Sequence, residues 1–156
     1  LGVWGDYLIG QAAKRADAWI PGAVGDKDAL ADRNATYEAA LEGAPKTRPL
    51  LRDIIVEDTE EAALSTAKSY LHEKYAVYQG RGHQFFTEYS EDVFDDYARD
   101  RVIYGTPEQC IEEIEAYRDL LDLDHFLLRF NYHGMPYDEM VARMERIADE
   151  ILPAFD

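Results

Sequence analysis

A glycine-containing turn near the start of the chain is the first feature that could bind a ligand. An apolar segment at residues 1–4 is followed by Gly5, and a helical pattern then covers residues 8–16. Glycine lets the backbone approach a ligand closely, and the first N–H groups of a helix favour an anion. The pattern predicts a phosphate-binding turn. A purely structural turn is the alternative, because Gly2 and Gly5 alone are weak evidence.

A second candidate site follows the apolar run at residues 125–130. Arg129 alternates in this run with Leu128 and Phe130, so its side chain points either into a site or outward under a helix. His133 follows in a polar loop, where an imidazole can act as an acid or a base, although a surface histidine is the commoner case. Arg129 and His133 are therefore the candidate catalytic residues.

Several other kinds of chemistry find no support in the sequence. No two of the four histidines have metal-ligand spacing such as H-x-x-x-H, so we predict no metal site. The chain has neither a G-x-S-x-G motif nor a Walker lysine motif. Cys110 is the single cysteine and lies early in a helical pattern, where a small packed hydrophobic residue is expected rather than a nucleophile.

Composition limits the partners and the compartment. Acidic residues outnumber basic ones 32 to 16, which gives a formal charge of −16 and argues against nucleic-acid binding. A hydrophobic content of 47% is typical of a globular chain. We find no signal peptide and no apolar run of the roughly 18 residues that a membrane span needs. A single cysteine fits a reducing compartment, so we expect a cytoplasmic protein.

Strand and helix patterns alternate along the chain. Short strands are predicted at residues 1–4 and 18–20, a longer one at 49–57 and a buried one at 125–130. Helices are predicted at residues 8–16, near 29–41 where residues 42–45 stop the helix, after Thr59, at 107–121 and up to residues 151–153. Thr59 is predicted to cap the helix that follows it, with Glu60 and Glu61 in the first turn. Thr106 and Gln109 form a capping box before the helix at residues 107–121.

This alternation predicts one domain, residues 1–156, with a parallel sheet and right-handed crossovers. Residues 80–100 break the rhythm, because their glycines, acids and aromatic residues have no clean period. A stretch of that length without a firm element is typical of a functional insertion or a mobile lid. We therefore predict that this insertion is the most mobile part of the chain.

Three segments resemble a known family. They are AAKRADAW at residues 12–19, VEDTEEAA at 56–63, and the C-terminal pattern GTPEQC…HFLLRF…ILPAF. Together they resemble the end of the bacterial luciferase-like flavin oxidoreductases, which are TIM (β/α)8 barrels. The resemblance implies an α/β fold, the C-terminal half of such a barrel, with about four strands and helices on one side. A whole barrel needs roughly 200 residues or more, so this chain of 156 residues is interpreted as a segment of a longer protein.

The resemblance also implies a cofactor and its site. Members of the family use reduced FMN with O2 to oxidise a small organic substrate, or a deazaflavin coenzyme for hydride transfer. Gly5, Asp6, Tyr7 and Leu8 hold the positions of the phosphate loop. The turn contains no Ser or Thr, so backbone amides would bind the phosphate, and Asp6 would repel it unless its side chain turned away. The family's key catalytic histidine lies in the first half-barrel, so we expect the isolated chain to be inactive.

Two alternatives remain open. One is a half-barrel that associates with itself as a binding or structural module, and the other is an unrelated doubly wound α/β domain with helices on both faces of an open sheet. Open strand edges at residues 1–4 and 125–130 would recruit other strands. We therefore expect a homodimer with two-fold symmetry.

Overall fold

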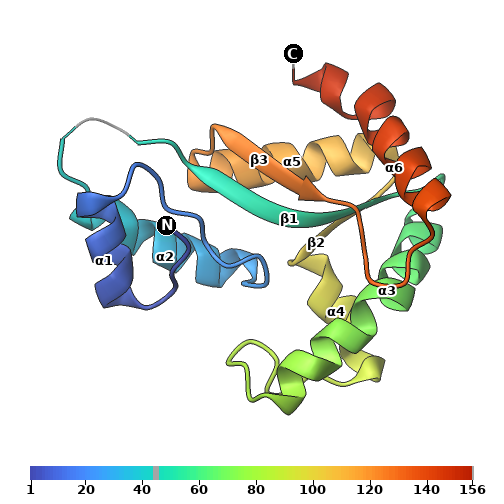
Figure 1. The fold of residues 1–156 in the computed structure, drawn as a ribbon, viewed down its shortest axis with the longest axis horizontal. Coiled ribbons are helices and arrows are strands. Elements are labelled where there is room, and N and C mark those ends of the chain that lie inside the picture. Colours follow the sequence, from blue (N-terminus) through green and yellow to red (C-terminus); the bar gives the residue numbers. More distant parts are fainter. Residues whose placement is uncertain (44–45, 156) are drawn as a thin grey trace. The chain divides into compact units, whose positions relative to one another are not determined.

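The computed structural model describes residues 1–43 and 46–155 and contains a parallel sheet with helices (Figure 1). The sheet has the order β2-β1-β3, with β1 at Pro49–Val56, β2 at Val102–Gly105 and β3 at His125–Arg129. Strands β1 and β2 are parallel, with a register that runs from Asp53 opposite Val102 to Val56 opposite Gly105. The predicted parallel α/β architecture is confirmed.

The chain divides into two compact units. Unit 1 comprises Leu1–Arg52 and Glu115–Leu128, and unit 2 comprises Asp53–Ile114 and Arg129–Asp156. In unit 1, α1 (Asp6–Arg15) packs against α2 (Lys27–Ala40).

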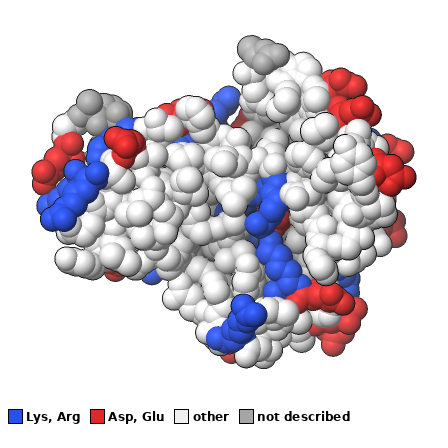
Figure 2. All heavy atoms as spheres, in the orientation of Figure 1, with Lys and Arg blue, Asp and Glu red and all other residues white. Residues whose placement is uncertain are grey.

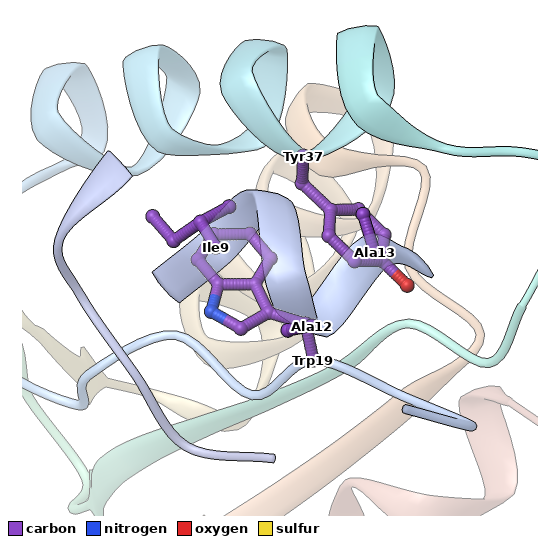
Figure 3. Close-up of a cluster of buried hydrophobic side chains, with 5 residues drawn as sticks. All are labelled: Ile9, Ala12, Ala13, Trp19 and Tyr37. Carbon is purple, nitrogen blue, oxygen red and sulfur yellow. The ribbon is translucent and has the colours of Figure 1, made fainter. Parts of the chain in front are cut away.

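The core between α1 and α2 is formed by apolar side chains that point toward one another (Figure 3). The Trp19 ring stacks on the Tyr37 ring with centroids 5.2 Å apart, and its Nε1–H donates to the Val3 carbonyl at 2.8 Å. Ile9 and Ala13 of α1 complete the cluster and are fully buried. This packing explains why the predicted helix at residues 8–16 forms, since one face of it is covered.

The first two predicted strands are reduced to single bridges. Gly2 pairs with Ile20 and Ala18 pairs with Thr47, both in the parallel sense. The expected edge at residues 1–4 is therefore not an edge of the named sheet, whereas β3 is one. Residues 44 and 45, within the predicted stop of α2, lie outside the described residues, and α2 itself ends at Ala40.

Capping confirms two of the predicted helix starts, both in unit 2. The Thr59 Oγ1 accepts from the Ala62 N–H at 3.2 Å and begins α3, Glu60–Gly80. The Thr106 N–H donates to Gln109 Oε1 at 2.9 Å, and the Gln109 N–H donates to Thr106 Oγ1 at 3.4 Å. This reciprocal pair is the predicted capping box, and it begins α5 at Pro107–Leu121.

The C-terminal part of unit 2 consists of α6 (Tyr137–Glu150) followed by the short 3₁₀ helix η2 (Leu152–Ala154). Within the described ranges, no helix combines the length and the apolar character that a membrane crossing requires.

The structure gives residues 80–100 firm elements, which the sequence analysis did not predict. After α3 come a 3₁₀ turn, η1 (Glu91–Val93), and α4 (Phe94–Arg99). Phe86 is fully buried, and its ring lies 4.8 Å from that of Tyr75 on α3. The aromatic side chains therefore have partners within the chain, which argues against the predicted mobility.

Strand β2 was not predicted from the sequence. It contains only four residues and directly precedes the capping box. Its partner is β1, roughly fifty residues earlier in the chain, and the register places Ile103 beside Ile54. Such non-local pairing is what turns a short apolar segment into a strand.

Candidate functional site

The turn before α1 presents backbone donors. Gly5 is the N-cap of α1 with φ −75° and ψ 143°, and no side chain caps the helix. The Gly5 carbonyl accepts from the Ile9 N–H at 2.9 Å. The N–H groups of Asp6, Tyr7 and Leu8 precede this first intrahelical bond and have no acceptor among the described residues. Three donors therefore lie at the positive end of the helix dipole.

The surface at Gly5 is open. A Cβ atom built on Gly5 would meet nothing within 4 Å, so the protein itself leaves room for close approach to the backbone. Tyr7 and Leu8 are also exposed, at 77% and 49% of their surface. The turn is thus open to solvent, and phosphate binding there stays a prediction.

The Asp6 side chain is turned toward α2. Its carboxylate forms an ion pair with the guanidinium of Arg33, which also lies over the Trp4 ring at 5.9 Å. Arg33 thereby offsets the negative charge that would repel a phosphate. Sequence reasoning missed Arg33, since nothing in a 27-residue separation identifies it as the partner of Asp6.

Arg129 belongs to a group of charges around the buried Asp53 carboxylate in unit 2. Its Nε–H donates to Asp53 Oδ1 at 2.5 Å and its Nη2 donates to Asp53 Oδ2 at 2.8 Å. Lys74 of α3 donates to the same Oδ2 at 2.8 Å. The Asp53 carboxylate is 1% exposed, so both cations compensate a charge that has lost its solvent. The side chain of Arg129 is therefore directed at Asp53.

The pKa values in this group follow from burial and pairing. Burial alone would raise the pKa of Asp53, but the hydrogen bonds and charges of Arg129 and Lys74 outweigh it and lower that pKa. Burial and the Arg129 charge lower the pKa of Lys74, and together they outweigh the raising effect of Asp53. The hydrogen bonds and charge of Asp53 raise the pKa of Arg129 against its burial. Arg129 consequently stays charged and binds anions rather than exchanging protons.

His133 and Tyr132 follow β3 in one loop. The Tyr132 hydroxyl lies 3.0 Å from the Ile54 carbonyl and 2.9 Å from the Arg129 carbonyl, and its single proton can serve one of them at a time. Burial raises the pKa of Tyr132. His133 is exposed, and its ring makes no hydrogen bond within the described ranges. The structure thus brings Arg129 and Lys74 together on Asp53, and among the described residues His133 has no polar partner.

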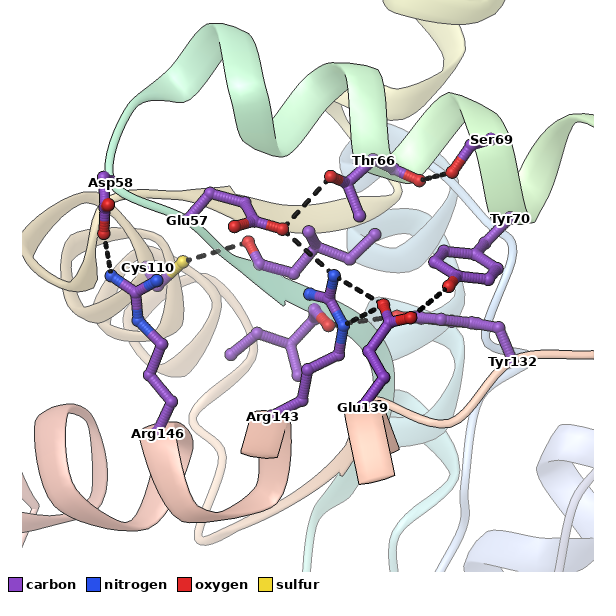
Figure 4. A network of polar contacts seen from close by, with 12 residues as sticks. Glu57, Asp58, Thr66, Ser69, Tyr70, Cys110, Tyr132, Glu139, Arg143 and Arg146 are labelled. Atoms are coloured by element: carbon purple, nitrogen blue, oxygen red, sulfur yellow. Dashed lines mark hydrogen bonds and ion pairs between the residues drawn. The ribbon is translucent and has the colours of Figure 1, made fainter. Parts of the chain in front are cut away.

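A second polar network connects the end of β1 with α3 and α6 (Figure 4). Glu57 Oε1 accepts from Arg143 Nη2 at 3.0 Å and from Thr66 Oγ1 at 3.1 Å. Arg143 Nε also donates to Glu139, whose other oxygen accepts from the Tyr70 hydroxyl at 2.9 Å. Burial lowers the pKa of Arg143, but its two carboxylate partners raise it more. This network holds α6 in place.

Cys110 lies beside this network, and its thiol is expected to be unreactive. It is fully buried, and its Sγ lies 3.8 Å from the Ile55 carbonyl. Burial raises the pKa of its thiol to about 12. A thiolate is therefore scarce at neutral pH, which confirms Cys110 as a packed side chain.

Charge is distributed in groups over the surface. On the face drawn in Figure 2, acidic side chains gather where α6 lies in Figure 1, and elsewhere acidic and basic side chains lie next to each other. In the part of the chain that the structure describes, no three His, Cys, Asp or Glu side chains are arranged to hold a metal ion.

The sequence profile of the luciferase-like monooxygenases matches residues 5–123. No curated protein sequence matches the chain significantly. The match covers the turn at Gly5, β1, β2 and α5, and therefore more than half of the chain.

Solved structures share the fold at low sequence identity. The oxygenating constituent of 3,6-diketocamphane monooxygenase from Pseudomonas putida, in complex with FMN, has a TM-score of 0.70 and 17% identity over 97% of this chain and 46% of its own. A coenzyme F420-dependent tetrahydromethanopterin reductase from Methanopyrus kandleri has a TM-score of 0.65 and 15% identity over 99% and 50%. A monooxygenase from Streptomyces bottropensis has a TM-score of 0.68 and 14% identity over 99% and 47%.

The chain thus spans about half the length of the luciferase-like TIM barrels that it matches.

Proposed function

Because the chain belongs to the luciferase-like monooxygenase family, we propose that it carries the phosphate-binding turn of a flavin-dependent oxidoreductase. The observation that carries this proposal is the turn itself, where Gly5 is open to solvent and three backbone N–H groups have no acceptor among the described residues. Such an arrangement suits a phosphate. The bound cofactor would supply the redox chemistry, and the chain would bind and orient it.

The residues present fit a phosphate anchored by backbone. Asp6, Tyr7 and Leu8 contribute the amides, Gly5 permits close approach, and Arg33 offsets the charge of Asp6. Three amide bonds at about 1–1.5 kcal/mol each give roughly 3–5 kcal/mol before entropic losses. We therefore expect only millimolar affinity for the cofactor from this chain alone.

The proposed cofactor is FMN, and the proposed reaction is oxidation of a small organic substrate with O2. One structural neighbour is a monooxygenase in complex with FMN, which supports this choice. The alternative is a deazaflavin coenzyme with hydride transfer, supported by neighbours that depend on F420. Since the chain spans about half of these enzymes, turnover is proposed for a whole protein, and we expect none from this chain alone.

We also propose that the chain forms a homodimer. Strand β3 is at an edge of the sheet, and Leu127 in it is 44% exposed. An unpaired edge with an exposed apolar side chain favours pairing with another strand. Sedimentation equilibrium at micromolar concentration should give twice the monomer mass, and a Leu127→Lys variant should shift the chain to monomer. A clean monomer in the unmodified chain would refute the dimer.

Residue-level titration tests the phosphate site. Addition of FMN should shift the backbone amide resonances of residues 5–8 first. Gly5→Val should abolish these shifts without unfolding the chain, because φ is −75° at this position and the space around it is open. Shifts that persist in Gly5→Val, or that arise in other segments, would move the site elsewhere.

A further inference from the structure

Two cations in unit 2 share one buried carboxylate, which leaves one positive charge in excess. Asp53 is 1% exposed, and Arg129 and Lys74 both bind it within 2.8 Å. One cation alone would neutralise the charge of Asp53, so the second one leaves the group with a net positive charge. The excess stands out in a chain whose formal charge is −16. At physiological salt, charges beyond about 8 Å are largely screened, so the local excess decides what binds there.

Both cations keep donors that Asp53 does not use. A guanidinium carries five N–H donors, and Asp53 occupies the edge formed by Nε and Nη2 of Arg129. The edge formed by Nη1 and Nη2 remains, and no other described residue accepts from it. Lys74 likewise donates only one of its three N–H groups to Asp53.

The unused donors can reach solvent and are held in place. The Arg129 side chain is 30% exposed and that of Lys74 is 24% exposed. Two hydrogen bonds to Asp53 hold the Arg129 guanidinium, and the Lys74 ammonium donates to Asp53 and lies 5.9 Å from the centre of the Tyr75 ring. Little side-chain entropy would be lost when an anion binds to groups fixed in this way.

We propose that Arg129 and Lys74 bind the carboxylate group of a small-molecule ligand. The open edge of Arg129 matches the two oxygens of a planar carboxylate, and Lys74 adds a charged donor. A monoanion neutralises the single excess charge, whereas a doubly charged phosphate would leave a negative charge in an acidic protein. Arg129 ends β3, and in parallel α/β folds ligands bind at the carboxyl ends of strands. The site does not depend on the proposed flavin function.

Titration of the chain with benzoate and with benzamide tests the proposal. These probes share their ring and differ in charge, so calorimetry should show millimolar binding of benzoate and at least tenfold weaker binding of benzamide. Benzoate affinity should fall as NaCl is raised. Equal affinity for both probes would overturn the proposal, and tighter binding of inorganic phosphate than of benzoate would overturn the assignment to carboxylate.

Variants locate the site. Lys74→Met should weaken benzoate binding at least fivefold, and Lys14→Met should leave it unchanged, because Lys14 pairs with Glu42 on the exposed surface of unit 1. Asp53→Asn should strengthen benzoate binding severalfold, since it removes the competing anion. An unchanged affinity in Lys74→Met refutes the site even if Asp53→Asn fails to fold.

Discussion

Replacement of Arg129 by Met should destabilise the chain, because it removes the bidentate partner of the buried Asp53 carboxylate. Loss of one member of a buried ion pair costs about 3–5 kcal/mol. Lys74 remains at 2.8 Å and continues to compensate part of the charge, so we expect the lower end, about 3 kcal/mol. The double variant Asp53→Asn with Arg129→Met removes both charges and should be less destabilised than Arg129→Met alone.

Urea unfolding at pH 7 measures these differences, and the four proteins of the cycle give the coupling energy between Asp53 and Arg129. We expect about 2 kcal/mol of coupling. Additive effects of the two substitutions, or a change below about 0.5 kcal/mol for Arg129→Met, would refute the account of this group. A Lys14→Met variant, at an exposed pair, should change stability by less than about 0.5 kcal/mol.

The same group predicts a pH dependence. The pKa of Asp53 is lower in the folded chain than its ordinary value of about 3.9. The unfolded chain therefore binds the proton first as the pH falls, so the stabilisation from Asp53 is complete above that value and is lost as the pH falls through the folded pKa. The difference in unfolding free energy between the unmodified chain and Asp53→Asn should shrink below pH 4. A constant difference down to pH 2 would contradict the lowered pKa.

Two further predictions concern packing. Cys110 should react with a thiol reagent only as fast as the protein opens, because it is buried with a thiol pKa of about 12, and rapid labelling of the native chain at pH 8 would contradict this. Phe86→Ala should cost about 3–5 kcal/mol in urea unfolding, since its ring is fully buried against Tyr75, and the amides of residues 86–98 should exchange slowly in the unmodified chain. A decrease in unfolding free energy below about 1 kcal/mol, together with rapid exchange of these amides, would instead support the mobile insertion that the sequence predicts.

The caps and the long helices could be predicted because their signals are local. Thr106 and Gln109 lie three residues apart, and their reciprocal hydrogen bonds follow from residue type and spacing. Strand β2 and the aromatic cluster around Phe86 could not be predicted in this way. Both depend on partners far along the chain, β1 for the strand and Tyr75 for the ring. A search for a regular helix or strand period does not detect side chains that are buried from turns and short helices.

In the candidate sites, too, the local features could be predicted and the distant partners could not. A glycine before a helical pattern indicates the turn at Gly5, whereas the cation Arg33 comes from another helix. Arg129 was identified from its place in a strand, but its partner Asp53 lies 76 residues earlier. Lys74 carried no signal at all, because a lysine on an amphipathic helix normally faces solvent.

The central claim is that this chain binds the phosphate of a flavin through the turn at residues 5–8. Parallel fluorescence titrations with FMN and with riboflavin test it most directly, because the two ligands differ only in the phosphate. The account predicts a millimolar dissociation constant for FMN and at least tenfold weaker binding of riboflavin. Equal affinities would contradict a phosphate anchor, and submicromolar affinity for both would show that this chain binds the ring system itself.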